Sequence, residues 1–175
     1  MFRVASLVAV VLAIFSLSAH AADPALSSAS NDAYLSANAI KKGVVTEPSG
    51  LQHRVIQNGF GKRPGATDTV TVYYKGALIN GTVFDSTEPG LPATFTVNKL
   101  IPGWMEALEL MREGDHWELV IPANLAYGAR GAGSGVIPPN QTLVFDLQLV
   151  TDTPPPPKKP GEGDDSNGGG GDSHY

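Results

Sequence analysis

Side chains that form covalent intermediates or hold metal ions are sparse in this sequence, and those present lack the spacing that such chemistry requires. The 175 residues include no cysteine, which excludes disulfides, thiolate metal sites and a cysteine nucleophile. The four histidines, His20, His53, His116 and His174, show no metal-ligand spacing. We therefore expect neither a metal site nor a cofactor.

A glycine-rich loop at Gly128–Gly135 comes nearest to a nucleotide-binding motif. It lacks the Lys-Ser/Thr pair of a phosphate-binding loop, and Val136 stands where a dinucleotide fingerprint needs its third glycine. The formal net charge is −5, and no runs of Lys or Arg occur. Because nucleic acids and anionic lipid surfaces attract basic proteins, we expect neither of them as a partner.

The remaining candidates are aromatic and apolar residues with a few polar members, arranged in six short motifs. These motifs are Val72–Gly76, Gly81–Ser86, Leu100–Trp104, Ala126–Gly128, Val136–Pro139 and Leu143–Asp146. In this order and at this spacing they resemble the motifs of the FKBP-type peptidyl-prolyl cis-trans isomerases, and the resemblance covers residues 46–150. One such motif alone is weak evidence, whereas six in register are strong.

The segment ahead of these motifs is similar to the bacterial Mip/FkpA-like branch of that family. It runs from Asn38 to Gln52 and includes Gly43–Thr46 and Pro48–Leu51. The branch places a long dimerising helical segment before the isomerase domain. Residues 22–42 are too few to supply it, and stable dimer interfaces bury on the order of 1,200–2,000 Å². We therefore expect a monomer or a weak dimer.

The resemblance also implies the residues of an active pocket. Trp104 would form the floor under a substrate proline ring, with Phe84 beside it. The Ile101 N–H and the Tyr127 hydroxyl would donate hydrogen bonds to bound carbonyls. Asp85 would approach the twisted amide carbonyl or hold Tyr127 and neighbouring groups in place. The implied substrate-binding residues are Tyr74, Phe95, Leu100, Ile101, Ile137 and Phe145. Lys99 departs from small eukaryotic members, which often carry an acid there.

The resemblance implies an activity, which is catalysis of rotation about X-Pro peptide bonds. The scarcity of reactive side chains agrees with this activity. Amide resonance opposes this rotation with a barrier of about 18–20 kcal/mol. An apolar cavity that strips water from the carbonyl and favours the twisted form needs no nucleophile. The implied substrates are X-Pro-containing polypeptides, including exported proteins during folding, and macrolide immunosuppressants of the FKBP-ligand class are implied as further ligands.

A second interpretation assigns the chain the same fold but no catalytic activity. The chain would then be a non-catalytic proline-ligand binding module or a holdase chaperone. Taken singly, Phe84, Trp104 and Phe145 would be ordinary core residues. The presence of Asp85, Trp104 and Tyr127 together favours the enzyme.

The elements that must position these residues indicate an α+β fold, with an antiparallel sheet of about five strands wrapped around one short α-helix. Apolar and polar residues alternate at Thr69–Tyr74 and Trp117–Ile121, as in half-buried strands. Asn80-Gly81 predicts a hairpin turn. The helix is expected to follow Pro102 and to end at Gly114.

A second, N-terminal helix is expected from Asp32 to Lys42. Asp32 would cap it and Gly43 would stop it. Its narrow apolar stripe would consist of Tyr34, Ala37 and Ile40.

The chain is expected to divide into four parts. Residues 1–21 fit a secretory signal peptide, with a basic start, an apolar run too short to span a bilayer and an Ala19-His20-Ala21 cleavage pattern. Residues 22–45 would form a mobile N-terminus with the short helix, 46–151 the FKBP-type domain, and 152–175 a disordered Pro/Gly-rich tail. We expect an exported, periplasmic protein without stable membrane insertion.

Overall fold

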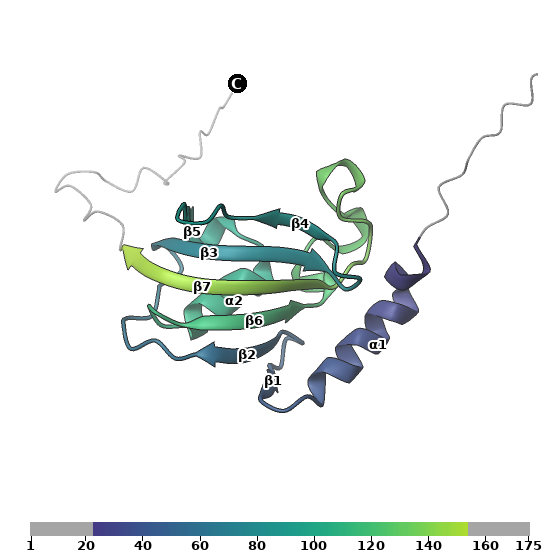
Figure 1. Ribbon diagram of the computed structural model, residues 1–175, viewed down its shortest axis with the longest axis horizontal. Helices are drawn as coiled ribbons and strands as arrows, with labels where there is room; N and C mark the ends of the chain where they lie inside the picture. The colour runs from purple at the N-terminus through teal and green to yellow at the C-terminus, as the bar shows by residue number, and fades with distance from the viewer. Residues whose placement is uncertain (1–22, 154–175) are drawn as a thin grey trace, which may run out of the picture.

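The computed structural model describes residues 23–153, and within them seven strands form one antiparallel sheet. The strands are β1 (Val44–Thr46), β2 (Gln52–Gln57), β3 (Thr69–Leu78), β4 (Val83–Ser86), β5 (Ala93–Thr96), β6 (His116–Ile121) and β7 (Leu143–Thr153). Their order across the sheet is β1-β2-β6-β7-β3-β4, and β5 pairs with the first half of β3. Figure 1 shows helix α2 (Pro102–Leu110) behind this sheet.

The expected α+β class, with an antiparallel sheet and a covering helix, is confirmed, but the sheet has more strands than the expected five. The two short edge strands β1 and β4 hold three and four residues. So few residues give almost no alternation of apolar and polar side chains, which explains why the sequence did not reveal them. The predicted hairpin turn is present: Gly81 has φ +87° and its N–H donates to the Leu78 carbonyl at 2.9 Å.

Helix α2 packs closely on the sheet because a glycine faces a strand. A Cβ atom on Gly103 would lie 2.4 Å from Cγ2 of Ile121 on β6, which is closer than carbon atoms pack. The prediction that this helix ends at Gly114 is wrong. It ends at Leu110, and Gly114, with φ +89°, lies in the turn that leads to β6.

Helix α1 (Ser28–Ala39) begins four residues before the predicted start. The hydroxyl of Ser27, not the side chain of Asp32, caps it by accepting the Ser30 N–H at 3.2 Å. A single turn of 3₁₀-helix (Pro24–Leu26) precedes it. The predicted apolar stripe is also wrong, because Ile40 follows the helix and is 87% exposed.

Two buried asparagines, about two helical turns apart, attach α1 to the sheet instead. Asn31 accepts the Thr142 N–H at 2.7 Å and donates to the Gln141 side chain at 3.2 Å. Asn38 donates to the Gln52 side chain at 2.9 Å. Because these partners lie at the starts of β7 and β2, the helix lies beside this end of the sheet, as Figure 1 shows.

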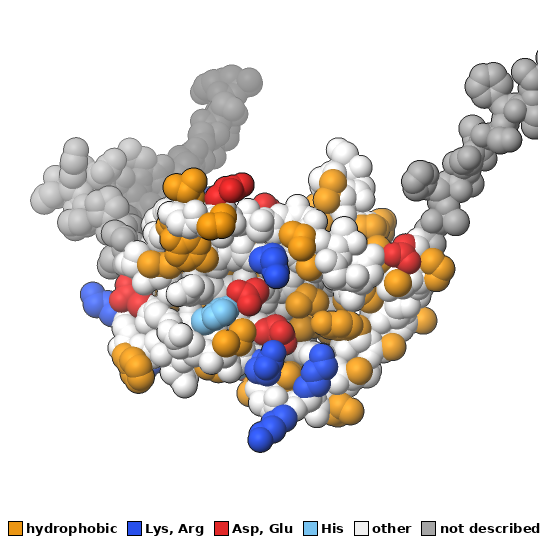
Figure 2. Space-filling model, in the orientation of Figure 1, with side chains coloured by type: hydrophobic (Ala, Val, Ile, Leu, Met, Phe, Trp, Pro, Cys, Tyr) orange, Lys and Arg blue, Asp and Glu red, His pale blue; other side chains and the backbone are white. Residues whose placement is uncertain are grey.

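The outer face of the sheet is polar. Figure 2 shows side chains of both charges and a histidine over β6 and β7. Arg54 contacts Glu118 at 3.1 Å, and His116 contacts Asp146 at 2.7 Å. The apolar core therefore lies on the other face, between the sheet and α2. In residues 23–153 no helix is long and apolar enough to cross a membrane.

Substituting Gly103→Ala tests the close approach of α2 to β6. Alanine is the better helix former by about 1 kcal/mol, so it would stabilise a helix that faced open space. Here the added methyl group must displace Ile121, and we expect the free energy of unfolding to fall by about 1–3 kcal/mol. Urea denaturation measures this change. Gly65→Ala is the matched control, since its Cβ would meet Asp68 at an ordinary 3.4 Å. Equal effects at the two sites would contradict the packing account.

Candidate active site

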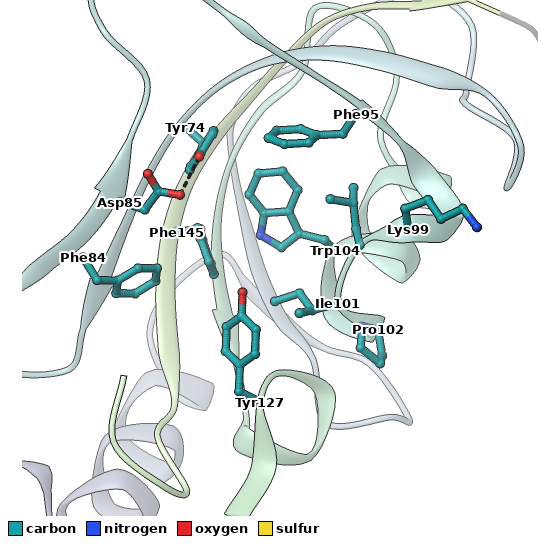
Figure 3. Close-up of a pocket in the computed structure, with 11 residues that line it drawn as sticks. Tyr74, Phe84, Asp85, Phe95, Lys99, Ile101, Pro102, Trp104, Tyr127 and Phe145 are labelled. Carbon is teal, nitrogen blue, oxygen red and sulfur yellow. Dashed lines mark hydrogen bonds between the residues drawn. The ribbon is translucent and has the colours of Figure 1, made fainter. Parts of the chain in front are cut away.

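A cavity of about 480 Å³ opens between α2, the strands β3, β4, β5 and β7, and the loop that follows β6. Figure 3 shows aromatic side chains from these separate elements around it. The residues that line it are Tyr74, Phe84, Asp85, Phe95, Lys99, Leu100, Ile101, Pro102, Trp104, Tyr127 and Phe145. Its size and its mostly apolar wall with a few polar groups are typical of ligand sites.

Trp104 lies at the centre of this wall and is only 4% exposed. Its ring meets Tyr74 and Phe145 edge-to-face, with centroids 5.2 Å apart in each case, and Phe95 at 6.0 Å. Each such pair contributes about 0.5–1.5 kcal/mol beyond burial. Three neighbours on different strands therefore fix the orientation of the indole.

A glycine on β3 allows the two phenylalanines to meet. The rings of Phe84 and Phe145 are 5.6 Å apart and nearly perpendicular. A Cβ atom on Gly76 would lie 2.6 Å from Phe145 and 2.7 Å from Phe84. Any larger residue at this position would push at least one ring out of place.

The carboxylate of the site is bound to a tyrosine. The Tyr74 hydroxyl donates a hydrogen bond of 2.6 Å to Oδ2 of Asp85, as Figure 3 shows. Burial, and then the hydrogen bond and the negative charge of Asp85, raise the pKa of Tyr74 well above its usual value of about 10. This hydroxyl therefore stays protonated at physiological pH.

Two further donors remain available at the cavity. Tyr127 is 40% exposed, and in Figure 3 its hydroxyl points toward the cavity. The backbone N–H of Ile101, the residue that caps α2, has no hydrogen-bond acceptor within residues 23–153. An unpaired N–H in an apolar surrounding binds an incoming carbonyl without first losing another partner.

The structure brings together all of the predicted pocket residues except Ile137. Ile137 is buried in the core. Its backbone N–H and carbonyl both form hydrogen bonds with the backbone of Ala132, across the loop between them. Of the groups that Asp85 was expected to hold, no hydrogen bond joins it to Tyr127 in the described residues, whereas it accepts one from the neighbouring Tyr74. Lys99 and Pro102 line the cavity but were not predicted to do so. Pro102 belongs to the motif Leu100–Trp104, and Lys99 directly precedes that motif at a position where the sequence departs from small eukaryotic members.

Comparison with known proteins decides the family. A family model described as FKBP-type peptidyl-prolyl cis-trans isomerase matches residues 61–150, about half of the chain. The chain belongs to this family. The matched region carries the whole lining of the FKBP pocket, from Tyr74 to Phe145.

Relatives place the chain in the Mip/FkpA branch of the FKBP family. It is 57% identical over 124 residues to the outer membrane protein MIP of Legionella longbeachae. The aligned region covers 70% of this chain and 53% of that protein. It is 58% identical over 118 residues to the FKBP-type 22 kDa peptidyl-prolyl cis-trans isomerase of Escherichia coli, covering 67% and 57%. The chain thus spans about half the length of these relatives.

A solved structure supports the same fold. The crystal structure of FkpA from Escherichia coli superposes with a TM-score of 0.69 at 43% identity. The match covers 74% of this chain and 62% of FkpA.

The raised pKa of Tyr74 gives a pH prediction. We expect Tyr74→Phe to leave unchanged the phenolate absorbance that the folded protein develops near pH 10, because Tyr74 ionises only at higher pH. The sign for stability follows from the raised pKa. The protonated hydroxyl makes its full contribution to the free energy of unfolding below about pH 10, the usual tyrosine pKa. This contribution is lost as the pH rises above that value, because the unfolded chain then ionises first. A fall in phenolate amplitude near pH 10 in the variant would contradict this.

Proposed function

We propose that this chain is an enzyme that catalyses cis-trans isomerisation of X-Pro bonds in polypeptides. The observation that carries the proposal is the apolar cavity floored by buried Trp104, with free hydrogen-bond donors at its edge. Membership of the FKBP family supports it. Within the described residues no group of three or more His, Cys, Asp or Glu could hold a metal ion, and the reaction needs none.

The proposed mechanism rests on desolvation and shape. The proline ring packs on Trp104, which removes the preceding carbonyl from water. The amide then loses the solvent hydrogen bonds that favour its planar, polar resonance form, and the barrier of about 18–20 kcal/mol falls. The Ile101 N–H and the Tyr127 hydroxyl donate to carbonyls of the bound chain and hold it in the twisted geometry.

Asp85 has a positioning and electrostatic role in this proposal. Its Oδ2 holds the Tyr74 hydroxyl, which fixes Tyr74 against Trp104. Its Oδ1 has no hydrogen-bond partner in residues 23–153. That oxygen is thus free to accept a hydrogen bond from an N–H of the bound chain at the cavity edge. Phe84 closes the wall next to it.

The wider biology is part of the same proposal. The substrates are exported proteins that fold in the periplasm. This chain reaches the periplasm through its own signal peptide at residues 1–21, which lies outside the described residues. The isomerase domain was expected at residues 46–151, but its sheet begins with β1 at Val44 and continues to the end of β7 at Thr153, so the domain extends two residues further at each end. The rest of the expected tail, 154–175, lies outside the described residues, and the protein acts as a monomer or weak dimer. Macrolide immunosuppressants of the FKBP-ligand class occupy the same cavity. The name of the Legionella relative, an outer membrane protein, supports an envelope location.

The direct test is relaxation of X-Pro peptides after a solvent jump, with catalytic amounts of the full chain. We expect faster relaxation, unchanged by dialysis against a chelator. Binding of the peptides without faster relaxation would favour the non-catalytic binding module or holdase. A loss of activity that divalent ions restore would overturn the metal-free mechanism.

Single substitutions test the polar groups. We expect Asp85→Ala and Tyr127→Phe each to lower kcat/KM about two- to thirteenfold, because each variant loses one hydrogen bond at the site, worth about 0.5–1.5 kcal/mol. Tyr73→Phe is the matched control, because Tyr73 is the neighbour of Tyr74 on β3 and does not line the cavity. Circular dichroism checks that each variant folds. Wild-type rates for both site variants would show that the roles assigned here are mistaken.

Lys99 gives a prediction about substrate preference. It lies at the edge of the cavity, as Figure 3 shows, and it is the cation among the lining residues. We expect peptides with Glu before proline to be turned over two- to fivefold faster than peptides with Lys, since exposed pairs contribute about 0.2–1 kcal/mol. Lys99→Glu should reverse the order, while Lys42→Glu, on a distant exposed turn, should not. An unchanged preference in Lys99→Glu would rule out this role.

A further inference from the structure

A second cavity, of about 310 Å³, lies between the loop that joins β2 to β3 and the turn that follows α2. The start of β6 forms its base. None of its lining residues lines the active cavity. Its volume is at the lower end of the range for small-ligand sites, about 300–1,000 Å³.

The rim of this cavity is held by the backbone. The Gly61 N–H donates to the Glu113 carbonyl at 3.1 Å, and the Glu113 N–H donates to the Lys62 carbonyl at 2.9 Å. A Cβ on Gly59 would lie 2.2 Å from the Glu113 carbonyl oxygen, so only glycine allows this approach. The loop and the turn therefore form one fixed wall, which favours ligand binding because little ordering is needed.

The base and one side of the cavity are apolar. Trp117 is buried and stacks on His53 with centroids 4.3 Å apart. Leu110, the last residue of α2, lies beside it. Phe60 stands on the rim and is 94% exposed, so its ring is accessible to an incoming apolar group.

The other side is cationic. Arg63 and Arg112 both line the cavity, and neither forms an ion pair with a carboxylate in residues 23–153. The one acid in the lining, Asp115, is 5% exposed and accepts the backbone N–H groups of Gly59 and Arg112. These bonds hold its carboxylate in the wall, and two arginines against one aspartate leave the lining with a net positive charge. The Arg112 guanidinium donates one hydrogen bond, of 3.2 Å, to the Gly61 carbonyl. Two guanidinium groups without a carboxylate partner in residues 23–153 therefore form a local site for an anion.

We propose that this second cavity binds a monocarboxylate with an apolar body. The planar guanidinium fork of Arg63 or Arg112 matches a carboxylate with two parallel hydrogen bonds, and the apolar body packs on Trp117 and Leu110. The C-terminal residue of a polypeptide and a free aromatic acid share this chemistry. The site is independent of the isomerase cavity and does not require that activity.

Nuclear magnetic resonance of the two indole N–H groups tests the proposal on the full chain. The sequence holds only two tryptophans, so Trp104→Phe assigns both signals. We expect N-acetyl-phenylalanine to shift the Trp117 signal saturably and to leave the Trp104 signal unchanged. Its amide, N-acetyl-phenylalaninamide, has the same body without the charge and should bind at least tenfold more weakly. Equal binding of acid and amide, or no Trp117 shift at millimolar acid, would overturn the proposal.

Arginine variants and peptides complete the test. Arg63→Gln and Arg112→Gln should each weaken binding of the acid about three- to tenfold, while Arg54→Gln, which pairs with Glu118 elsewhere, should not. A peptide that ends in phenylalanine, compared with its C-terminally amidated form, distinguishes the two sources. Binding of the free-acid peptide assigns the site to polypeptide termini, and exclusion of the peptide assigns it to small acids. Unchanged affinity in both arginine variants would contradict the assigned chemistry.

Discussion

The contact between Gly103 and Ile121 is the constraint on which the candidate site depends. It brings α2 against β6, and the next residue, Trp104, is thereby set among the aromatic rings of β3, β5 and β7. The floor of the cavity is therefore part of the hydrophobic core. Truncating so buried a ring costs about 3–5 kcal/mol in typical proteins, so stability and ligand binding cannot be separated at this position.

The polar groups of the site are few, and each is fixed by a different means. The Ile101 N–H is free because it precedes a helix, where the first N–H groups lack intrahelical acceptors. Asp85 is fixed by the Tyr74 hydroxyl, and Tyr127 by the short turns that follow β6. This arrangement suits a reaction that breaks no covalent bond, because the cavity must exclude water and hold one twisted shape.

Much of the fold and most of the cavity lining could be predicted from sequence, because long alternating strands and motifs in a known order carry strong signals. The errors have physical causes. Helix α1 docks through Asn31 and Asn38, whose amides find partners far away in sequence, and hydrophobic periodicity cannot detect such polar burial. Ile137 lies in a loop whose path depends on its pairing with Ala132. The second cavity is formed by segments about fifty residues apart and has no motif.

The most direct test of the central claim is exchange spectroscopy on an X-Pro peptide mixed with a small amount of the protein. One sample then reports both the cis-trans exchange rate of the peptide and the indole signal of Trp104. The account predicts exchange within seconds or less, against tens of seconds or more without catalyst, together with a shift of the Trp104 signal. Uncatalysed exchange despite a shifted Trp104 signal, or fast exchange with that signal unmoved, would contradict it.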